Sequence, residues 1–219
     1  HALQLWLLKA LQQQRESGSL LLEMLNPDQQ AKVAATQTAS RARKMPVDLP
    51  AALAWQAGWD WALYGPIIRY GLLQPAPLLA ANLDRDEIMT IYRTQPHLPA
   101  GQATQASVQA ALLAQIETSH CGLLPAAQLP AMLAVQQQRD RRMAERLLAA
   151  PTPAVLLAGG FHVRRDLGVP LHLQDLAAPG GTERVLILAE VGQAVSAERA
   201  DFVWYTPAVP AQDHCASMR

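Results

Sequence analysis

The hydrophobic positions of this chain form short uninterrupted runs that are separated by longer segments with helical periodicity. Short apolar runs of this kind are typical of strands that are buried on both faces of a sheet. Five segments have this character: Leu20–Leu25, Pro77–Leu83, Ala154–Ala158, Arg184–Glu190 and Phe202–Thr206. Because helical segments alternate with these strands, the pattern predicts an α/β fold with a mainly parallel sheet flanked by helices.

The segments between the strands repeat apolar residues at the spacing of a helix. Helices are predicted over Leu3–Leu11, from Asn26 to about Lys44, over Ala51–Tyr64 and Ile67–Leu73, from Asp84, and over Ser107–Ser119 and Leu129–Ala149. Gly65 and Pro66 are expected to interrupt the helix that ends at Tyr64. Since the middle of the chain has few strand signals, residues 1–83 and 151–219 are predicted to form the parallel α/β domain. Residues 84–150 are predicted to form a smaller all-helical subdomain.

Composition and charge argue against a nucleic-acid-binding protein and against a membrane-spanning one, but they do not indicate a function. Half of the 219 residues are hydrophobic, which is enough to bury a sizeable core. The formal net charge is zero, so no basic surface indicates a nucleic-acid partner. No apolar run approaches the roughly 20 residues that span a bilayer. Cys121 and Cys215 fit no metal-binding spacing, and both a disulfide between them and two buried thiols remain open.

Polar side chains follow several of the predicted strands. Glu23, Asn82, His162 and Glu190 lie at or just beyond the carboxyl ends of four of them. Ligands of open α/β sheets bind at that edge, so these residues predict a site with two carboxylates, an amide and an imidazole. The alternative is structural: Glu23 pairs with an arginine or caps a turn, and His162 has a packing or surface role.

The loop after Ala154–Ala158 carries further charged residues. Arg164, Arg165 and Asp166 follow His162 closely, and an arginine fork matches the geometry of a carboxylate or phosphate. Arg164 is the better candidate for such a contact. Arg165 is better explained by a local ion pair on a solvated loop. His172 is expected to lie exposed in a loop.

Two helices carry further candidate residues. Tyr64 follows three tryptophans, and tyrosine is a known ligand of haem iron, although tryptophan-rich helices are more often core packing. Gln136 and Asp140 lie on the apolar stripe of the helix Leu129–Ala149. They indicate either an internal polar network or a helix rotated so that both residues touch water.

The loop sequence also resembles a known family. The segment 159–173 contains GFHVRRDLGVPLHL, which is similar to the GxHxRxDxGVPxxL signature of the ChaN-like haem-binding uptake family in the Tiki-like superfamily. The further matches occur in the same order along the chain. They are LEML with Glu23, then Gln30, Trp61 with Tyr64 and Pro66, AANL around Asn82, SHCGLLP around Cys121, QQQRDRRMA from Gln136 to Ala144, and DFVWYTP near the end.

This resemblance implies an iron-regulated bacterial lipoprotein on the periplasmic side of the outer membrane. It implies a haem-binding protein of haem acquisition that is not an enzyme and that holds two facing haem groups in a homodimer. A tyrosine of one subunit then ligates the iron, and a histidine of the other binds the propionates. By motif, Tyr64 is the candidate ligand, with Tyr70 as its alternative, and His162 is the candidate propionate partner. Arg164 is added as a second propionate contact because of its charge.

The same resemblance leaves further expectations. Partners are expected among outer-membrane haem receptors or other uptake components. The family carries a first strand and a histidine pair, and the sequence begins at what resembles the second histidine, His1. If that first strand is absent from the molecule, the sheet is expected to lack a strand beside Leu20–Leu25. Because relatives in the superfamily include esterases and proteases, a hydrolase remains the alternative. Glu23, His162 and Glu190 would then supply a general base or metal ligands.

Overall fold

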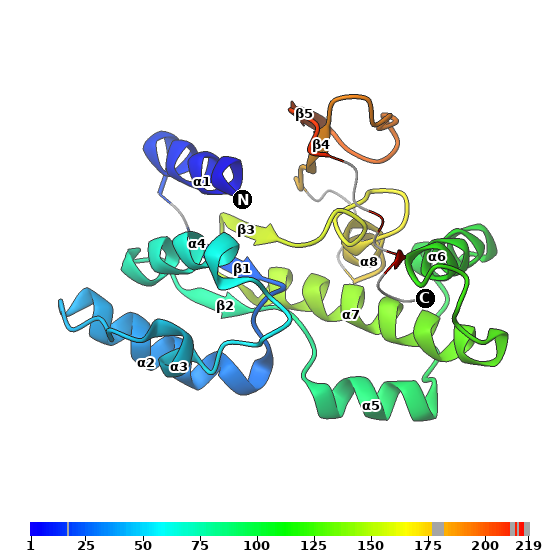
Figure 1. The fold of residues 1–219 in the computed structure, drawn as a ribbon, viewed down its shortest axis with the longest axis horizontal. Coiled ribbons are helices and arrows are strands. Elements are labelled where there is room, and N and C mark those ends of the chain that lie inside the picture. The colour runs from blue at the N-terminus through cyan, green and yellow to red at the C-terminus, as the bar shows by residue number, and fades with distance from the viewer. Residues whose placement is uncertain (17, 177–181, 211–212, 214, 217–219) are drawn as a thin grey trace. The chain divides into compact units, whose positions relative to one another are not determined.

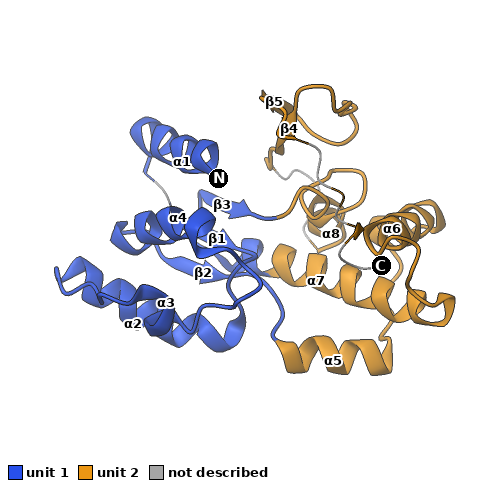
Figure 2. Cartoon of the chain, viewed as in Figure 1, with its two compact units in different colours: residues 1–84, 146–158 blue, residues 85–145, 159–219 orange. Residues whose placement is uncertain are grey.

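The computed structural model describes residues 1–16, 18–176, 182–210, 213, 215 and 216 (Figure 1). The chain divides into two compact units (Figure 2). Unit 1 consists of His1–Asp84 and Arg146–Ala158, and unit 2 of Arg85–Glu145 and Gly159–Arg219. The division predicted from the sequence differs in grouping residues 159–219 with the sheet of unit 1, and it stays a prediction.

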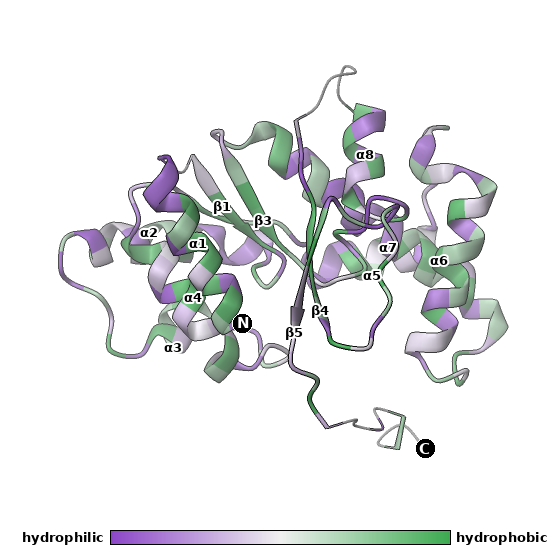
Figure 3. Cartoon of the chain, turned by 90° about the horizontal axis from the view of Figure 1, so that it is seen from above, coloured by the Kyte–Doolittle hydropathy of each residue, from purple (hydrophilic) through white to green (hydrophobic). Residues whose placement is uncertain are grey.

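Unit 1 is built on a parallel sheet of three strands in the order β2–β1–β3. The strands are β1 (Ser19–Leu22), β2 (Leu78–Ala80) and β3 (Ala154–Leu157). Leu20 of β1 lies opposite Leu78 on one side and Val155 on the other. All four residues of β1 are buried, and hydrophobic colours follow β1 and β3 (Figure 3). The predicted parallel sheet flanked by helices is therefore confirmed.

Because β1 pairs with a strand on each side, no position beside it is open. The gap beside Leu20–Leu25, expected if the first strand is absent, is therefore not present, because β2 and β3 occupy both positions.

The helices of unit 1 pack around this sheet. They are α1 (Ala2–Gln14), α2 (Gln30–Arg41), α3 (Leu49–Leu53) and α4 (Trp61–Leu73), with a 3-10 turn at Pro27–Gln29 before α2. Helix α2 contacts both α4 and β2, and α1 contacts α4. The buried face of α4 carries Ile67, Ile68 and Leu72, which join the leucines of the sheet in one hydrophobic core.

The segment expected to form one helix over Ala51–Tyr64 instead contains the end of α3 and the beginning of α4. Ala54 ends α3 in the left-handed region with φ 47°. Asp60 caps α4, since its carboxylate accepts a hydrogen bond from the backbone N of Ala62 at 2.8 Å. Trp55 Nε1 donates to the carbonyl of Trp59 at 2.7 Å and holds the connection in place. Capping chemistry therefore overrides the apolar periodicity here.

The predicted break at Gly65 and Pro66 is also wrong, because α4 continues through both residues. Pro66 lies on the exposed face, where water can hydrate the carbonyl that loses its partner, while Ile67 and Ile68 stay packed in the core. Gly65 serves packing instead: a Cβ there would lie 2.8 Å from the Trp61 indole. Tertiary packing therefore offsets the cost of a proline inside a helix.

The outer edge of the sheet is covered by two glutamine side chains of α2. Gln37 Nε2 donates to the carbonyls of Gly71 at 3.0 Å and Ala76 at 2.8 Å. Gln37 Oε1 accepts from the N of Leu78 at 3.3 Å. Gln30 Oε1 accepts from the N of Ala80 at 2.7 Å. These amides act as a partner for β2, which is an edge strand of the sheet as far as the described residues show.

Unit 2 combines helices with a second sheet. Its elements are α5 (Arg85–Thr94), α6 (Ala106–Ser119), most of α7 (Leu129–Ala149), α8 (Val169–Leu176), β4 (Leu186–Glu190) and β5 (Phe202–Thr206), with 3-10 turns at Gln102–Thr104 and Ala126–Gln128. Strands β4 and β5 pair in parallel, with Leu186 opposite Phe202. A disulfide joins Cys121 to Cys215, which decides between the two alternatives left open for these cysteines. Among the helices described, none is long and apolar enough to cross a membrane.

Candidate functional site

Tyr64 lies on α4 within a cluster of aromatic rings in unit 1. Its ring centroid is 5.4 Å from that of Trp59, in an edge contact, and 6.5 Å from that of Trp55. The imidazole of His1 lies 4.3 Å away. Trp61 packs edge-on to Trp55 at 5.1 Å. The cluster holds the Tyr64 ring in a fixed orientation with part of its surface exposed.

The hydroxyl of Tyr64 makes no hydrogen bond to any described residue. Burial, and secondarily the negative charge of Glu23, raise the pKa of this phenol above its usual value. The protein alone therefore favours the neutral phenol over the phenolate. A phenolate at this position needs a cationic partner, and a ferric centre supplies one.

Tyr70, the alternative ligand, lies on the same helix but is engaged differently. Its hydroxyl donates to Gln12 Oε1, and it lies 3.3 Å from the carbonyl of Leu8. Burial raises the pKa of Tyr70. The hydroxyl of Tyr70 therefore ties α4 to α1, whereas that of Tyr64 has no such structural contact in the described part of the chain.

His162 lies in unit 2, in the loop between β3 and α8, and it is buried. Its carbonyl accepts a hydrogen bond from the N of Val169 at 2.8 Å. Gly168 passes so close that a Cβ there would lie 2.0 Å from the same carbonyl. Gly168 and Val169, which belong to the GxHxRxDxGVPxxL motif, close the loop that carries His162. This contact explains why a glycine is needed at position 168.

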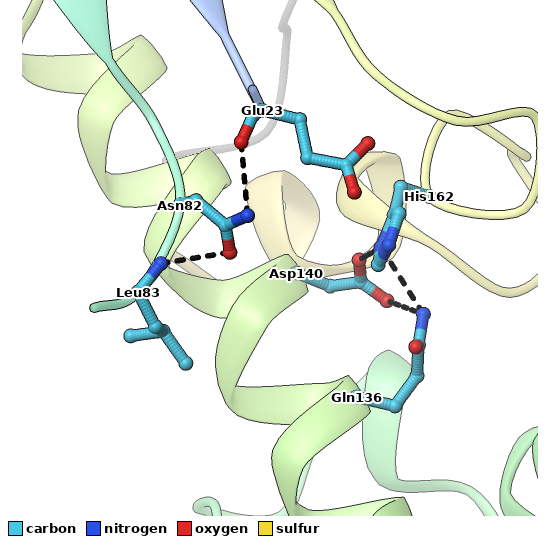
Figure 4. Close-up of polar contacts among 6 residues, drawn as sticks. All are labelled: Glu23, Asn82, Leu83, Gln136, Asp140 and His162. Carbon is cyan, nitrogen blue, oxygen red and sulfur yellow. Dashed lines mark hydrogen bonds and ion pairs between the residues drawn. The ribbon is translucent and has the colours of Figure 1, made fainter. Parts of the chain in front are cut away.

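The ring of His162 faces two polar residues of α7 (Figure 4). Nδ1 contacts Asp140 Oδ1 and lies 3.1 Å from Gln136 Nε2. Gln136 Nε2 also reaches Asp140 Oδ2 at 3.4 Å. Asp140 is completely buried. Of the two interpretations of this helix, the internal polar network is confirmed. The helical stripe indicated Asp140 and Gln136, but it did not indicate their contact with His162.

The two arginines after His162 each pair with a carboxylate. Arg164 binds Asp166 through Nε at 2.8 Å and Nη2 at 2.5 Å. Arg165 pairs with Asp201 at 3.3 Å. Burial alone would raise the pKa of Asp166, but the hydrogen bonds and charge of Arg164, with the charge of Arg199, lower it below its usual value. The predicted local ion pair is present for Arg165, and it occurs for Arg164 as well.

The residues predicted at one sheet edge are divided between two sheets. In unit 1, Asn82 Nδ2 donates to the carbonyl of Glu23 at 2.9 Å, and Asn82 Oδ1 accepts from the N of Leu83 at 2.8 Å (Figure 4). Glu190 ends β4 in the second sheet, where its carboxylate accepts from the N of Val209 at 3.3 Å. Glu23 and Asn82 are therefore brought together, and Glu190 belongs to a different sheet.

His172 is misplaced by the sequence prediction, because it lies in α8 and is 1% exposed instead of lying in an exposed loop. Neither ring nitrogen has a hydrogen-bond partner among the described residues. The signal for burial was available: Pro170 favours the first turn of a helix. His172 is three positions after Val169, so it lies on the same face of α8 as this buried valine.

No cluster of three or more His, Cys, Asp or Glu side chains arranged to hold a metal ion occurs in the described ranges. The two buried histidines of unit 2 both interact with Asp140: His162 contacts its carboxylate directly, and His172 interacts with its charge.

Comparison with known proteins adds two findings. The family model described as "Haem-binding uptake, Tiki superfamily, ChaN" matches residues 1–173. A solved structure described as cofacial haem binding to ChaN of Campylobacter jejuni is similar to this chain with a TM-score of 0.75 and 27% identity. The match covers 89% of this chain and 76% of that one. No curated protein matches the chain.

Proposed function

Because the chain belongs to the ChaN family of haem-binding uptake proteins in the Tiki superfamily, we propose that it binds haem with Tyr64 as the ligand of the iron. Haem is the cofactor that membership of this family gives to the chain. The choice of Tyr64 is based on the aromatic cluster in unit 1.

One observation carries the assignment: a partly exposed tyrosine lies among tryptophans with a hydroxyl that no described residue binds. Apolar aromatic surface suits a flat porphyrin. Bound haem supplies an iron that accepts a phenolate oxygen, which offsets the burial that otherwise keeps Tyr64 protonated. The residues present therefore fit the group. Tyr64 provides the oxygen, and Trp59 and Trp55 fix the orientation of its ring.

We further propose a homodimer in the haem-loaded state, with Tyr64 of one subunit and His162 of the other at each haem. The relative from Campylobacter jejuni is described as binding haem cofacially, and two stacked haem groups require two subunits if each subunit brings one tyrosine. An imidazole suits a propionate because a ring nitrogen donates a hydrogen bond to the carboxylate. Arg164 is a second contact only through Nη1, since Nε and Nη2 bind Asp166.

The proposal extends to where the protein works. A disulfide between Cys121 and Cys215 is typical of an oxidising compartment such as the bacterial periplasm. We therefore propose a lipoprotein on the periplasmic side of the outer membrane that holds haem without turning over a substrate. Its partners would be an outer-membrane haem receptor or other uptake components.

The alternative function is a hydrolase, and one observation favours it. The contact between Asp140 and His162 is also the arrangement by which a carboxylate orients a general base. Glu23 and Glu190 remain the other candidate residues of this alternative. It predicts turnover of an ester or peptide by the haem-free protein, and an absence of turnover across such substrates would leave haem binding as the function.

The haem ligand is tested by a titration of the Tyr64→Phe variant with haemin. We expect the wild type to show the charge-transfer absorption of a tyrosinate bound to ferric haem, and the variant to lose it. Because the hydroxyl lacks a partner in the described chain, its removal should change the free energy of unfolding by less than about 0.5 kcal/mol.

Tyr70→Phe is the matched control on the same helix. It should keep the tyrosinate spectrum and lose about 1 kcal/mol of stability, because it removes the hydrogen bond to Gln12. The assignment is wrong if Tyr64→Phe keeps the spectrum, and the roles are exchanged if Tyr70→Phe loses it.

A further inference from the structure

The loop that joins α2 to α3 in unit 1 is basic and carries a fully exposed apolar side chain. Arg43 and Lys44 are both exposed, and Val47 is fully exposed. None of these three residues belongs to the proposed haem site. The loop is therefore a candidate for a separate interaction.

This loop is held firmly on the rest of unit 1. The backbone N of Arg43 donates to the carbonyl of Ser40 at 3.0 Å. The backbone N of Lys44 donates to the carbonyl of Ala39 at 2.8 Å. Met45 packs against the hydrophobic core. Because the backbone is fixed on both sides of Met45, the loop presents its exposed side chains in a defined direction.

Residues of α2 and α4 extend the same surface. Arg69 Nη1 lies 3.1 Å from the sulfur of Met45, which places this guanidinium beside the loop. Leu73 is four positions after Arg69, so it lies on the same face of α4, and it is also exposed. Arg41 Nε donates to the carbonyl of Gln74 at 2.8 Å, next to Leu73. The basic patch thus combines four cations with two exposed apolar side chains: Arg41, Arg43, Lys44, Arg69, Val47 and Leu73.

The positive charge of the basic patch is not neutralised within the described part of the chain. None of its four cations forms an ion pair with a described residue. Asp48 follows Val47, but its carboxylate caps α3 by accepting from the N of Ala51 at 3.0 Å. The formal net charge of the chain is zero, so the patch is a local concentration of charge. An anionic surface outside the molecule would complement it.

We propose that the basic patch binds the surface of an anionic phospholipid bilayer. The four cations would contact lipid phosphates, and Val47 and Leu73 would enter the boundary between headgroups and acyl chains. Each lysine or arginine near an anionic bilayer adds to the affinity, and buried apolar surface adds to it further. The two apolar side chains favour a bilayer over a purely ionic partner such as nucleic acid. The proposal does not depend on haem binding or on the role of Tyr64.

The first test is flotation of the haem-free, 219-residue chain with lipid vesicles. One set of vesicles contains phosphatidylcholine alone, and the other also contains phosphatidylglycerol. We expect binding to the anionic vesicles only, with an affinity that decreases as salt is added. Equal binding to both sets, or no binding to the anionic set, would overturn the proposal.

The second test neutralises the loop in the double variant Arg43→Gln/Lys44→Gln. One cation near an anionic bilayer contributes about fivefold in affinity, so the partition coefficient should fall by about 25-fold. Both side chains are exposed, so the thermal unfolding temperature should stay unchanged. Lys9→Gln/Lys32→Gln is the matched control, because both lysines are exposed in unit 1 and lie outside the patch. An equal loss in the control would show that binding follows the net charge of the chain, and would overturn the proposal.

Val47→Ser tests the apolar part of the patch. This variant keeps every charge, so its binding should remain sensitive to salt. Its partition coefficient should fall by about fivefold, because part of the valine side chain no longer leaves water for lipid. An unchanged coefficient would indicate a purely ionic contact, and would overturn the assignment to a bilayer.

Discussion

We expect His172, which is buried and has no hydrogen-bond partner in the described part of the chain, to make unit 2 sensitive to acid. Burial lowers the pKa of His172, and the charge of Arg141 lowers it further, while Asp140, Asp175 and Glu145 act in the opposite direction. The unfolded chain therefore binds a proton at a higher pH than the folded one. Stability is complete above the usual histidine pKa of about 6.5 and decreases as the pH falls below it.

We expect His172→Leu to remove part of this dependence. One proton changes the free energy of unfolding by at most about 1.4 kcal/mol per pH unit. Urea unfolding at several pH values between 7.5 and 5 should therefore give a flatter profile for the variant than for the wild type. His97→Leu, at an exposed position, should keep the wild-type slope. Parallel profiles for the wild type and His172→Leu would contradict the role of His172.

At the level of residues, the sequence indicated the side chains but not all of their partners. His162 was indicated because it follows a strand, and Asp140 because it interrupts an apolar helical stripe. Their contact spans 22 residues of sequence, and periodicity reports which face a side chain occupies, not what it meets there. His172 was missed because no helix was expected after Gly168.

At the level of elements, the edge of the sheet depends on side-chain amides. Gln37 is buried and bonds to both the strand and the segment before it. Gln37→Leu should lower the free energy of unfolding by about 1–3 kcal/mol, because carbonyls of Gly71 and Ala76 are left without this donor. The measurement is chemical denaturation followed by circular dichroism.

Gln30→Leu is the comparison for this prediction. Gln30 bonds to the same strand but is partly exposed, so water replaces part of what the amide provides, and a smaller loss is expected. If the two substitutions lower the free energy of unfolding equally, burial of the glutamine does not determine the size of the loss. A neutral Gln37→Leu would contradict the role of this side chain.

The elements themselves were predictable where a single local signal dominated. Apolar runs indicated each strand from β1 to β5 in the described part of the chain, and the helix Leu129–Ala149 has the expected bounds. The helix predicted over Ala51–Tyr64 was wrong because two signals competed. Asp60 caps a new helix, while the aromatic residues around it continue the apolar pattern. The helix break predicted at Pro66 was also wrong, because tertiary packing decides whether a helix tolerates a proline, and the local sequence does not report that packing.

At the level of the whole molecule, the parallel sheet and the family were predictable, and the pairing of strands was not. Strand order depends on contacts between distant segments, so the separation of β4 and β5 into their own sheet has no local signature. The ordered motifs along the chain compensate for this, since they indicated the haem-binding family independently of strand order. Tyr64 and His162 lie in different units, and the proposed dimer gives each haem one residue from each subunit.

A mixing experiment tests this shared site most directly. Tyr64→Phe and His162→Ala each damage both sites of their own homodimer. A dimer with one subunit of each kind has one site that lacks both residues and one that keeps both. An equimolar mixture of the two variants, titrated with haemin and measured by absorption and sedimentation, should recover the wild-type tyrosinate spectrum in a dimer. The recovered amount should correspond to one intact site per mixed dimer. A mixture that behaves as the sum of the two separate variants would contradict a site built from Tyr64 of one subunit and His162 of the other.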